Sequence, residues 1–134
     1  MYIEKVKKSK LIIEQHFHGA YGIDFANCSV EEVLDLSEKL LYHGIGGFFA
    51  TLATDTIENI NRQIGILKEA SKKQQNKSSK ILGVHLEGLF LNPEKKGIHD
   101  ETQFLELNIE NFKKMQPYCA KIYNLSTKNL LCMV

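Results

Sequence analysis

An acidic side chain at the end of a short apolar run is the feature of this sequence most able to do chemistry. Residues 81–86 read Ile-Leu-Gly-Val-His-Leu, and Glu87 and Gly88 follow. A short apolar run that stops at glycine predicts a strand buried on both faces in a parallel sheet. Side chains alternate along a strand, so His85 and Glu87 project to the same side, with Glu87 at the carboxyl end, where α/β folds bind ligands. The alternative for Glu87 is a carboxylate that is simply solvated.

A pair of histidines ends another apolar segment near the amino terminus. Residues 11–18 read Leu-Ile-Ile-Glu-Gln-His-Phe-His, and Gly19 follows. Imidazoles at positions i and i+2 share one face of a strand, which suits His16 and His18 to bind one metal ion or to flank one substrate group. Two partly exposed histidines at a strand end are the alternative. Because both candidate sites fall at the same end of parallel strands, we expect the imidazoles and the Glu87 carboxylate to meet around a divalent cation.

Both candidate sites lie within longer motifs that contain glycine. Residues 16–25 read His-Phe-His-Gly-Ala-Tyr-Gly-Ile-Asp-Phe. Residues 85–88 read His-Leu-Glu-Gly, and residues 92–99 read Asn-Pro-Glu-Lys-Lys-Gly-Ile-His. These motifs resemble the two signatures of the N-acetylglucosamine-6-phosphate deacetylases, a family of the amidohydrolase superfamily of metal-dependent barrels. The resemblance runs at matching spacing over residues 11–125, nearly the whole chain.

The resemblance implies a role for each matching residue. Glu87 matches the metal-ligand glutamate of the family, and His16 and His18 match a histidine pair that contributes to a metal site in many members. Ile98 and His99 match positions that contact the substrate, a phosphorylated amino sugar. The implied cofactor is a divalent metal, zinc or iron. The implied reaction is the hydrolysis of N-acetylglucosamine 6-phosphate to glucosamine 6-phosphate and acetate.

The resemblance also implies that part of the family's active site lies outside this chain. The family takes two further histidine ligands and its catalytic aspartate from later strands, so no catalytic residue is assigned here. A (β/α)₈ barrel needs roughly 250 residues, and the chain has 134. We therefore expect residues 1–134 to form one domain, a truncated barrel that is a homo-oligomer or is completed by a C-terminal fragment. The alternatives are a non-catalytic remnant that binds metal or a phosphosugar, and an unrelated small α/β binding domain.

Helix start signals separate the predicted strands. Ser29 and Glu32 form a capping box for a helix that ends near Tyr42. Asp55 and Glu58 repeat the pattern at the start of a second helix, whose apolar residues recur at helical spacing. Both helices therefore present one apolar face to a sheet.

The predicted element order is βαβαβαβ. Residues 47–52 predict the strand between the first two helices, residues 108–115 a third helix, and residues 119–125 a fourth strand. Because crossover connections are right-handed, this order predicts an arc of parallel strands with helices outside, an α/β fold of the partial TIM-barrel type.

Composition argues against several other classes of protein. The net charge of +1 and the 43% of hydrophobic residues suit neither a polyanion-binding protein nor a disordered one. The lysine-rich residues 68–80 lack interleaved aromatics and arginines, so we expect a solvated helix end and loop rather than a nucleic-acid surface. No apolar stretch approaches the length of a membrane span. The three cysteines form no Cys-x-x-Cys pair and fit free thiols in a cytoplasmic protein.

Overall fold

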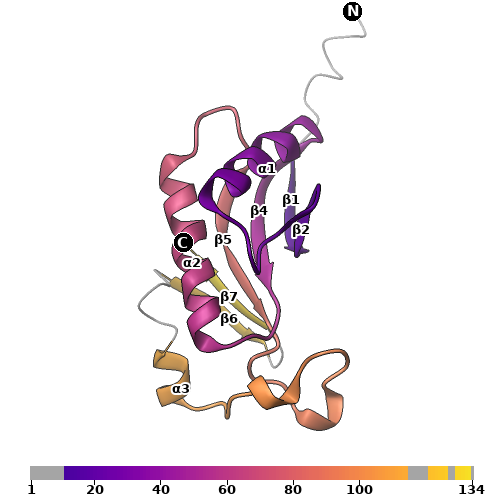
Figure 1. Ribbon diagram of the computed structural model, residues 1–134, viewed down its shortest axis with the longest axis vertical. Coiled ribbons are helices and arrows are strands. Elements are labelled where there is room, and N and C mark those ends of the chain that lie inside the picture. The colour runs from indigo at the N-terminus through magenta and orange to yellow at the C-terminus, as the bar shows by residue number, and fades with distance from the viewer. Residues whose placement is uncertain (1–10, 115–120, 127–128, 134) are drawn as a thin grey trace, which may run out of the picture.

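The computed structural model describes residues 11–114, 121–126 and 129–133, whose main element is a five-stranded sheet (Figure 1). The strands lie in the order β1-β4-β5-β7-β6. Their bounds are Ile12–Phe17 for β1, Ile45–Leu52 for β4, Lys80–Glu87 for β5, Lys121–Ser126 for β6 and Asn129–Met133 for β7. β1, β4 and β5 are parallel neighbours, as the sequence predicts.

Two long helices connect the parallel strands. α1 spans Val30–Tyr42 and α2 spans Ile57–Lys73, and they contact each other as well as β4 and β5. Each crossover moves one strand along the sheet in the same direction, so right-handed connections place both helices on the same face. A third helix, α3, spans Ile109–Lys113 after the predicted cap Asn108. No helix in the described ranges is both long enough and apolar enough to cross a membrane.

The helix starts confirm one predicted capping box and correct the other. The Ser29 hydroxyl accepts the Glu32 N–H at 3.2 Å, and the Glu32 carboxylate accepts the Ser29 N–H at 2.7 Å. At α2 the expected box of Asp55 and Glu58 is wrong, because the cap is Thr56, whose hydroxyl accepts the N–H three residues later at 3.2 Å. One Asp55 carboxylate oxygen instead accepts the Thr56 N–H at 2.6 Å, and the other accepts the side-chain amide of Asn59.

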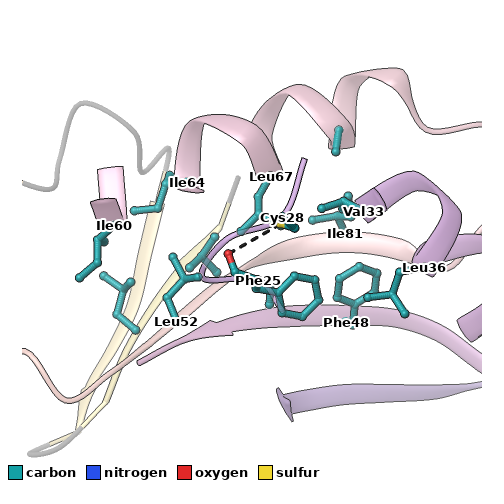
Figure 2. Close-up of a cluster of buried hydrophobic side chains, with 14 of the residues drawn as sticks. Phe25, Cys28, Val33, Leu36, Phe48, Leu52, Ile60, Ile64, Leu67 and Ile81 are labelled. Carbon is teal, nitrogen blue, oxygen red and sulfur yellow. Dashed lines mark hydrogen bonds between the residues drawn. The ribbon is translucent and has the colours of Figure 1, made fainter. Parts of the chain in front are cut away.

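The hydrophobic core lies between the helices and the sheet (Figure 2). Phe25 and Phe48 are fully buried and stack with ring centroids 5.9 Å apart. The apolar faces predicted for the helices point into this core, which includes Val33, Leu36, Leu40, Ile60, Ile64 and Leu67. This packing fixes β4 and β5 and hence the ends of the strands that carry the candidate site.

The predicted fourth strand forms, but its expected place in a parallel arc is wrong. β6 begins at Lys121, whereas the predicted strand began at residue 119, and residues 119–120 lie outside the described residues. β7 lies between β5 and β6 and pairs antiparallel with both. Only two residues separate β6 from β7, and a parallel pair needs a crossover of a dozen or more residues. The described sheet is therefore mixed, with the parallel arrangement confined to β1, β4 and β5.

A small hairpin that the sequence did not predict follows β1. β2 (Gly19–Ala20) pairs antiparallel with β3 (Ile23–Asp24). The two residues between them, Tyr21 and Gly22, have φ angles of 56° and 80°. Positive φ at both central positions defines the type I′ turn that suits a two-residue hairpin loop.

Candidate metal and substrate site

The carboxyl ends of the parallel strands bring the three predicted metal ligands together. His16 lies near the end of β1, His18 follows that strand, and Glu87 is the last residue of β5. The middle strand β4 separates β1 from β5, so the side chains of His16, His18 and Glu87 meet above the end of β4. Within the described part of the chain, this is the one group of three metal-ligand side chains whose ligand atoms all lie within 4.8 Å of one another.

The spacing of these atoms fits a divalent metal ion. His16 Nε2 lies 3.3 Å from Glu87 Oε2, and His18 Nε2 lies 3.1 Å from the same oxygen. A tetrahedral zinc ion with bonds of about 2.0–2.1 Å places neighbouring donor atoms ~3.3–3.4 Å apart. Two imidazoles and a carboxylate are also a donor set that suits zinc or iron. The three side chains can therefore hold such an ion after a small movement of the imidazoles toward each other.

A bulge in β1 fixes the backbone between the two histidines. Glu14 pairs with Phe48 and Phe17 with Ala50, so three steps along β1 match two along β4. Side chains satisfy the N–H groups that leave the ladder: the Glu14 carboxylate accepts the His16 N–H at 2.9 Å, and the Thr51 hydroxyl accepts the Phe17 N–H at 3.0 Å. The Thr51 hydroxyl of β4 thus holds the backbone of Phe17, the residue between His16 and His18.

A buried histidine packs against the cluster of His16, His18 and Glu87. His85 is 5% exposed, and its ring centroid lies 4.8 Å from that of His16. Its Nδ1 lies 3.2 Å from the hydroxyl of Thr51, which is 1% exposed. Burial, and next the nearby His16 imidazole, lowers the pKa of His85. His85 packs against His16 and hydrogen-bonds Thr51, in surroundings that favour the neutral imidazole.

The two predicted substrate-contacting residues border the same pocket as the predicted metal ligands. The pocket has a volume of about 500 Å³. Its lining includes His16, His18, Glu87, Lys96, Ile98 and His99. Ile98 is 100% exposed, whereas His99 is half-buried. Lys95 and Lys96 add positive charge to this side of the pocket, and Lys96 Nζ lies 3.3 Å from Glu101 Oε2.

A second threonine, in the loop that follows β4, contacts the ring of His99. The Thr54 hydroxyl lies 2.9 Å from His99 Nδ1 and 3.4 Å from the carbonyl oxygen of Glu87, to which it donates. Gly88 passes beside this contact with a φ angle of 100°. The end of β5 and the long connection after it therefore meet at Thr54.

Known proteins share this architecture over part of their length. No protein-family model matches the chain. The chain is 29% identical over 118 residues to N-acetylglucosamine-6-phosphate deacetylase of Bacillus subtilis, a match that covers 87% of this chain and 30% of that enzyme. For the Haemophilus influenzae enzyme of the same name the identity is 33% over 99 residues, which covers 73% and 25% respectively. The crystal structure of the Thermotoga maritima enzyme aligns with a TM-score of 0.68 and 28% identity, covering 81% of this chain and 29% of that one.

The predicted resemblance to N-acetylglucosamine-6-phosphate deacetylases is confirmed. The chain spans less than a third of the length of the deacetylases it matches. The sequence relatives and the solved structure carry the same enzyme name, and most of the mixed α/β fold described here is similar to part of that structure.

The deacetylase-like motifs did not reveal the two threonines. Thr51 lies near the carboxyl end of β4, within the strand predicted at residues 47–52, and Thr54 lies just beyond that strand. One signal could have found them: a strand that lies between two site-bearing strands of a parallel sheet ends at the same edge, so hydroxyl side chains there must adjoin the site. The lysines of the pocket were likewise not predicted, although they belong to the motif at residues 92–99.

Proposed function

We propose that this chain forms the first part of a metal-dependent amidohydrolase barrel of the (β/α)₈ type, folded as one domain. The supporting observation is the order β1-β4-β5, in which each strand is added on the same side of the preceding one with its helix on one face. This singly wound order is the pattern of a barrel, whereas a doubly wound sheet reverses its direction. In the described residues the parallel run of strands ends at β5, which pairs antiparallel with β7.

The proposed activity is the hydrolysis of N-acetylglucosamine 6-phosphate to glucosamine 6-phosphate and acetate. The observation that carries it is that His16 and His18 lie 3.3 and 3.1 Å from the same oxygen of Glu87, in the pocket that His99 also borders. We assign these three side chains to one divalent metal ion, zinc or iron, and Ile98 and His99 to contacts with the sugar. A bound divalent metal supplies Lewis acidity and activates water for attack on an amide carbonyl.

In this proposal the residues of the chain bind the metal ion and orient the sugar phosphate. Glu87 offers one carboxylate oxygen to which both imidazoles already point, and Thr51 fixes the peptide between those imidazoles. The positive charges of Lys95 and Lys96 at the pocket favour a phosphorylated ligand, because unlike charges attract. The pocket therefore suits an anionic sugar with its reacting group toward the imidazoles.

A second candidate function is a module that binds metal and phosphosugar without catalysis. Glu87 is the only carboxylate among the described residues that line the pocket, and the proposal uses it as a metal ligand. General acid–base catalysis contributes typically ~10²–10⁴-fold in rate and needs a further group. In this candidate function a complementing segment or a second copy of the chain would supply that group. The exposed side chains of Leu11, Ile12 and Ile13, just before and at the start of β1, favour such an association.

We also propose a cytoplasmic location. The support is Cys28, a buried cysteine with a free thiol, which is typical of proteins kept in a reducing compartment.

The decisive experiment measures acetate release from N-acetylglucosamine 6-phosphate by the full chain with added zinc or iron. Turnover that disappears in Glu87→Gln and persists in His43→Ala supports the deacetylase. His43 is a matched control because it is an exposed histidine at the C-cap of α1, outside the pocket. Metal-dependent binding of the sugar phosphate without acetate release supports the binding module. Absence of both binding and turnover would refute both functions.

A further inference from the structure

The hydroxyl of Thr54 makes two contacts that a single proton arrangement can satisfy. It donates to the Glu87 carbonyl oxygen at 3.4 Å, and it lies 2.9 Å from His99 Nδ1. A hydroxyl has one proton to donate and can accept through its oxygen. Both contacts are hydrogen bonds only if the Thr54 proton points to Glu87 and His99 Nδ1–H donates to the Thr54 oxygen. The remaining ring nitrogen of His99, Nε2, then carries no proton when the imidazole is neutral.

Thr54 belongs to a short connection that is held at both ends. It follows β4 by two residues and precedes Thr56, the N-cap of α2. His99 instead belongs to the long segment between β5 and α3, where the regular elements are two short 3₁₀ turns, Pro93–Lys95 and Glu101–Gln103. Because the core packs β4 and α2 firmly, the threonine is the fixed partner and the histidine is the one that is held.

Gly88 leaves the space in which this hydrogen bond forms. A Cβ atom at residue 88 would lie 2.8 Å from His99 Nδ1 and would also collide with the Thr54 hydroxyl oxygen. The φ angle of 100° is one that side chains other than glycine rarely adopt. The glycine after Glu87 thus allows the backbone to pass directly beside the contact of Thr54 with His99.

We infer that Thr54 is a positioning residue that holds the His99 imidazole by Nδ1 and presents Nε2 to the pocket as a hydrogen-bond acceptor. The inference deepens the proposed function and rests on it for the nature of the ligand. An acceptor at this position takes a hydroxyl or an amide N–H of the amino sugar. A charged imidazolium would instead donate from both nitrogens.

The test compares Thr54→Val with Thr54→Ser in the full, metal-free chain with ¹⁵N-labelled histidine. Imidazole ¹⁵N shifts identify which ring nitrogen carries the proton, and His99→Gln assigns the signal among the five histidines. We expect the neutral His99 ring to be the Nδ1–H tautomer in the wild type and in Thr54→Ser, and to shift toward the Nε2–H tautomer in Thr54→Val. An Nε2–H tautomer in the wild type, or a His99 signal unchanged in Thr54→Val, would overturn the inference.

Ligand binding gives a second readout that a general loss of structure would not mimic. With zinc added, Thr54→Val is expected to bind N-acetylglucosamine 6-phosphate about fivefold more weakly than wild type, the equivalent of ~1 kcal/mol, with Thr54→Ser close to wild type. Zinc affinity should change little in either variant, since Thr54 contacts the backbone carbonyl of Glu87 and, in the described residues, no metal-ligand atom of Glu87, His16 or His18. A wild-type chain that binds no sugar phosphate would contradict the proposed function, while the tautomer would still decide the role of Thr54.

Discussion

Replacing Thr51 with valine removes the hydroxyl that joins all three parallel strands at the candidate site. Thr51 lies on β4, accepts the Phe17 N–H of β1 at 3.0 Å and bonds to His85 of β5 at 3.2 Å. Valine has nearly the same shape but cannot make either bond. The substitution therefore separates the hydrogen bonding of this position from its packing.

The expected losses follow from the two groups that remain without a partner. A buried polar group that loses its partner costs about 1–3 kcal/mol. Phe17 is half-buried, so its N–H falls at the low end, whereas His85 Nδ1 lies in a side chain that is 5% exposed. The free energy of unfolding should fall by about 2–4 kcal/mol in total. Zinc affinity should fall about 10- to 100-fold, the range seen when a residue that orients a metal ligand is lost.

The assays are urea unfolding of the metal-free chain and zinc affinity measured by competition with a chelator. Ser37→Ala is the matched control, because its buried hydroxyl bonds to the Val33 carbonyl at 2.7 Å within α1, away from the metal ligands. The control should lose stability but keep wild-type zinc affinity, and Thr51→Ser should restore much of the affinity. If Thr51→Val bound zinc as tightly as Ser37→Ala, the assignment of Thr51 as a support of the histidine pair would be wrong.

Two further perturbations test neighbouring parts of the structure. Gly88→Ala should lower the free energy of unfolding by at least ~1–2 kcal/mol, since φ is 100° there, and should displace His99; a ¹⁵N imidazole signal like that of wild type would contradict this. The second perturbation is the titration of Cys28 at high pH. Burial is the largest cause that raises the pKa of its thiol to about 11. The unfolded chain loses this proton first as the pH rises, so this stabilising difference is complete below about pH 9 and is lost between about pH 9 and 11. Wild type should lose ~1 kcal/mol more than Cys28→Ala between pH 7 and pH 10 in urea unfolding, and equal losses would show that the thiol does not control this change.

The sequence was sufficient to predict that the three proposed metal ligands lie close together. The alternation of side chains put His16 and His18 on one face, and the apolar run before Glu87 identified a buried parallel strand. Parallel strands deliver their carboxyl ends to one edge, so three residues far apart in sequence could be placed together without knowing any distance. The capping box of Ser29 and Glu32 was equally local, since all its atoms lie within four residues.

Other features depend on a choice between alternative caps or strand neighbours, which the sequence alone does not decide. Asp55 and Thr56 are both able to cap α2, and only the local backbone decides that Thr56 does so. The strand β6 was predicted from its composition, but its neighbour depends on β7, a segment whose short connection favours antiparallel pairing. The contacts of Thr51 and Thr54 could not be predicted without knowing the register of β4 between its neighbours. A shift of one residue would turn the side chains of β4 to the opposite face.

Zinc titration of the metal-free chain tests most directly the claim that His16, His18 and Glu87 form one metal site. The account predicts one tight site per chain in the wild type and in His43→Ala, and loss of that site in Glu87→Gln and in His16→Ala. Calorimetry gives the number of ions and the affinity in the same experiment. A Glu87→Gln chain that binds one zinc ion with wild-type affinity would contradict the claim.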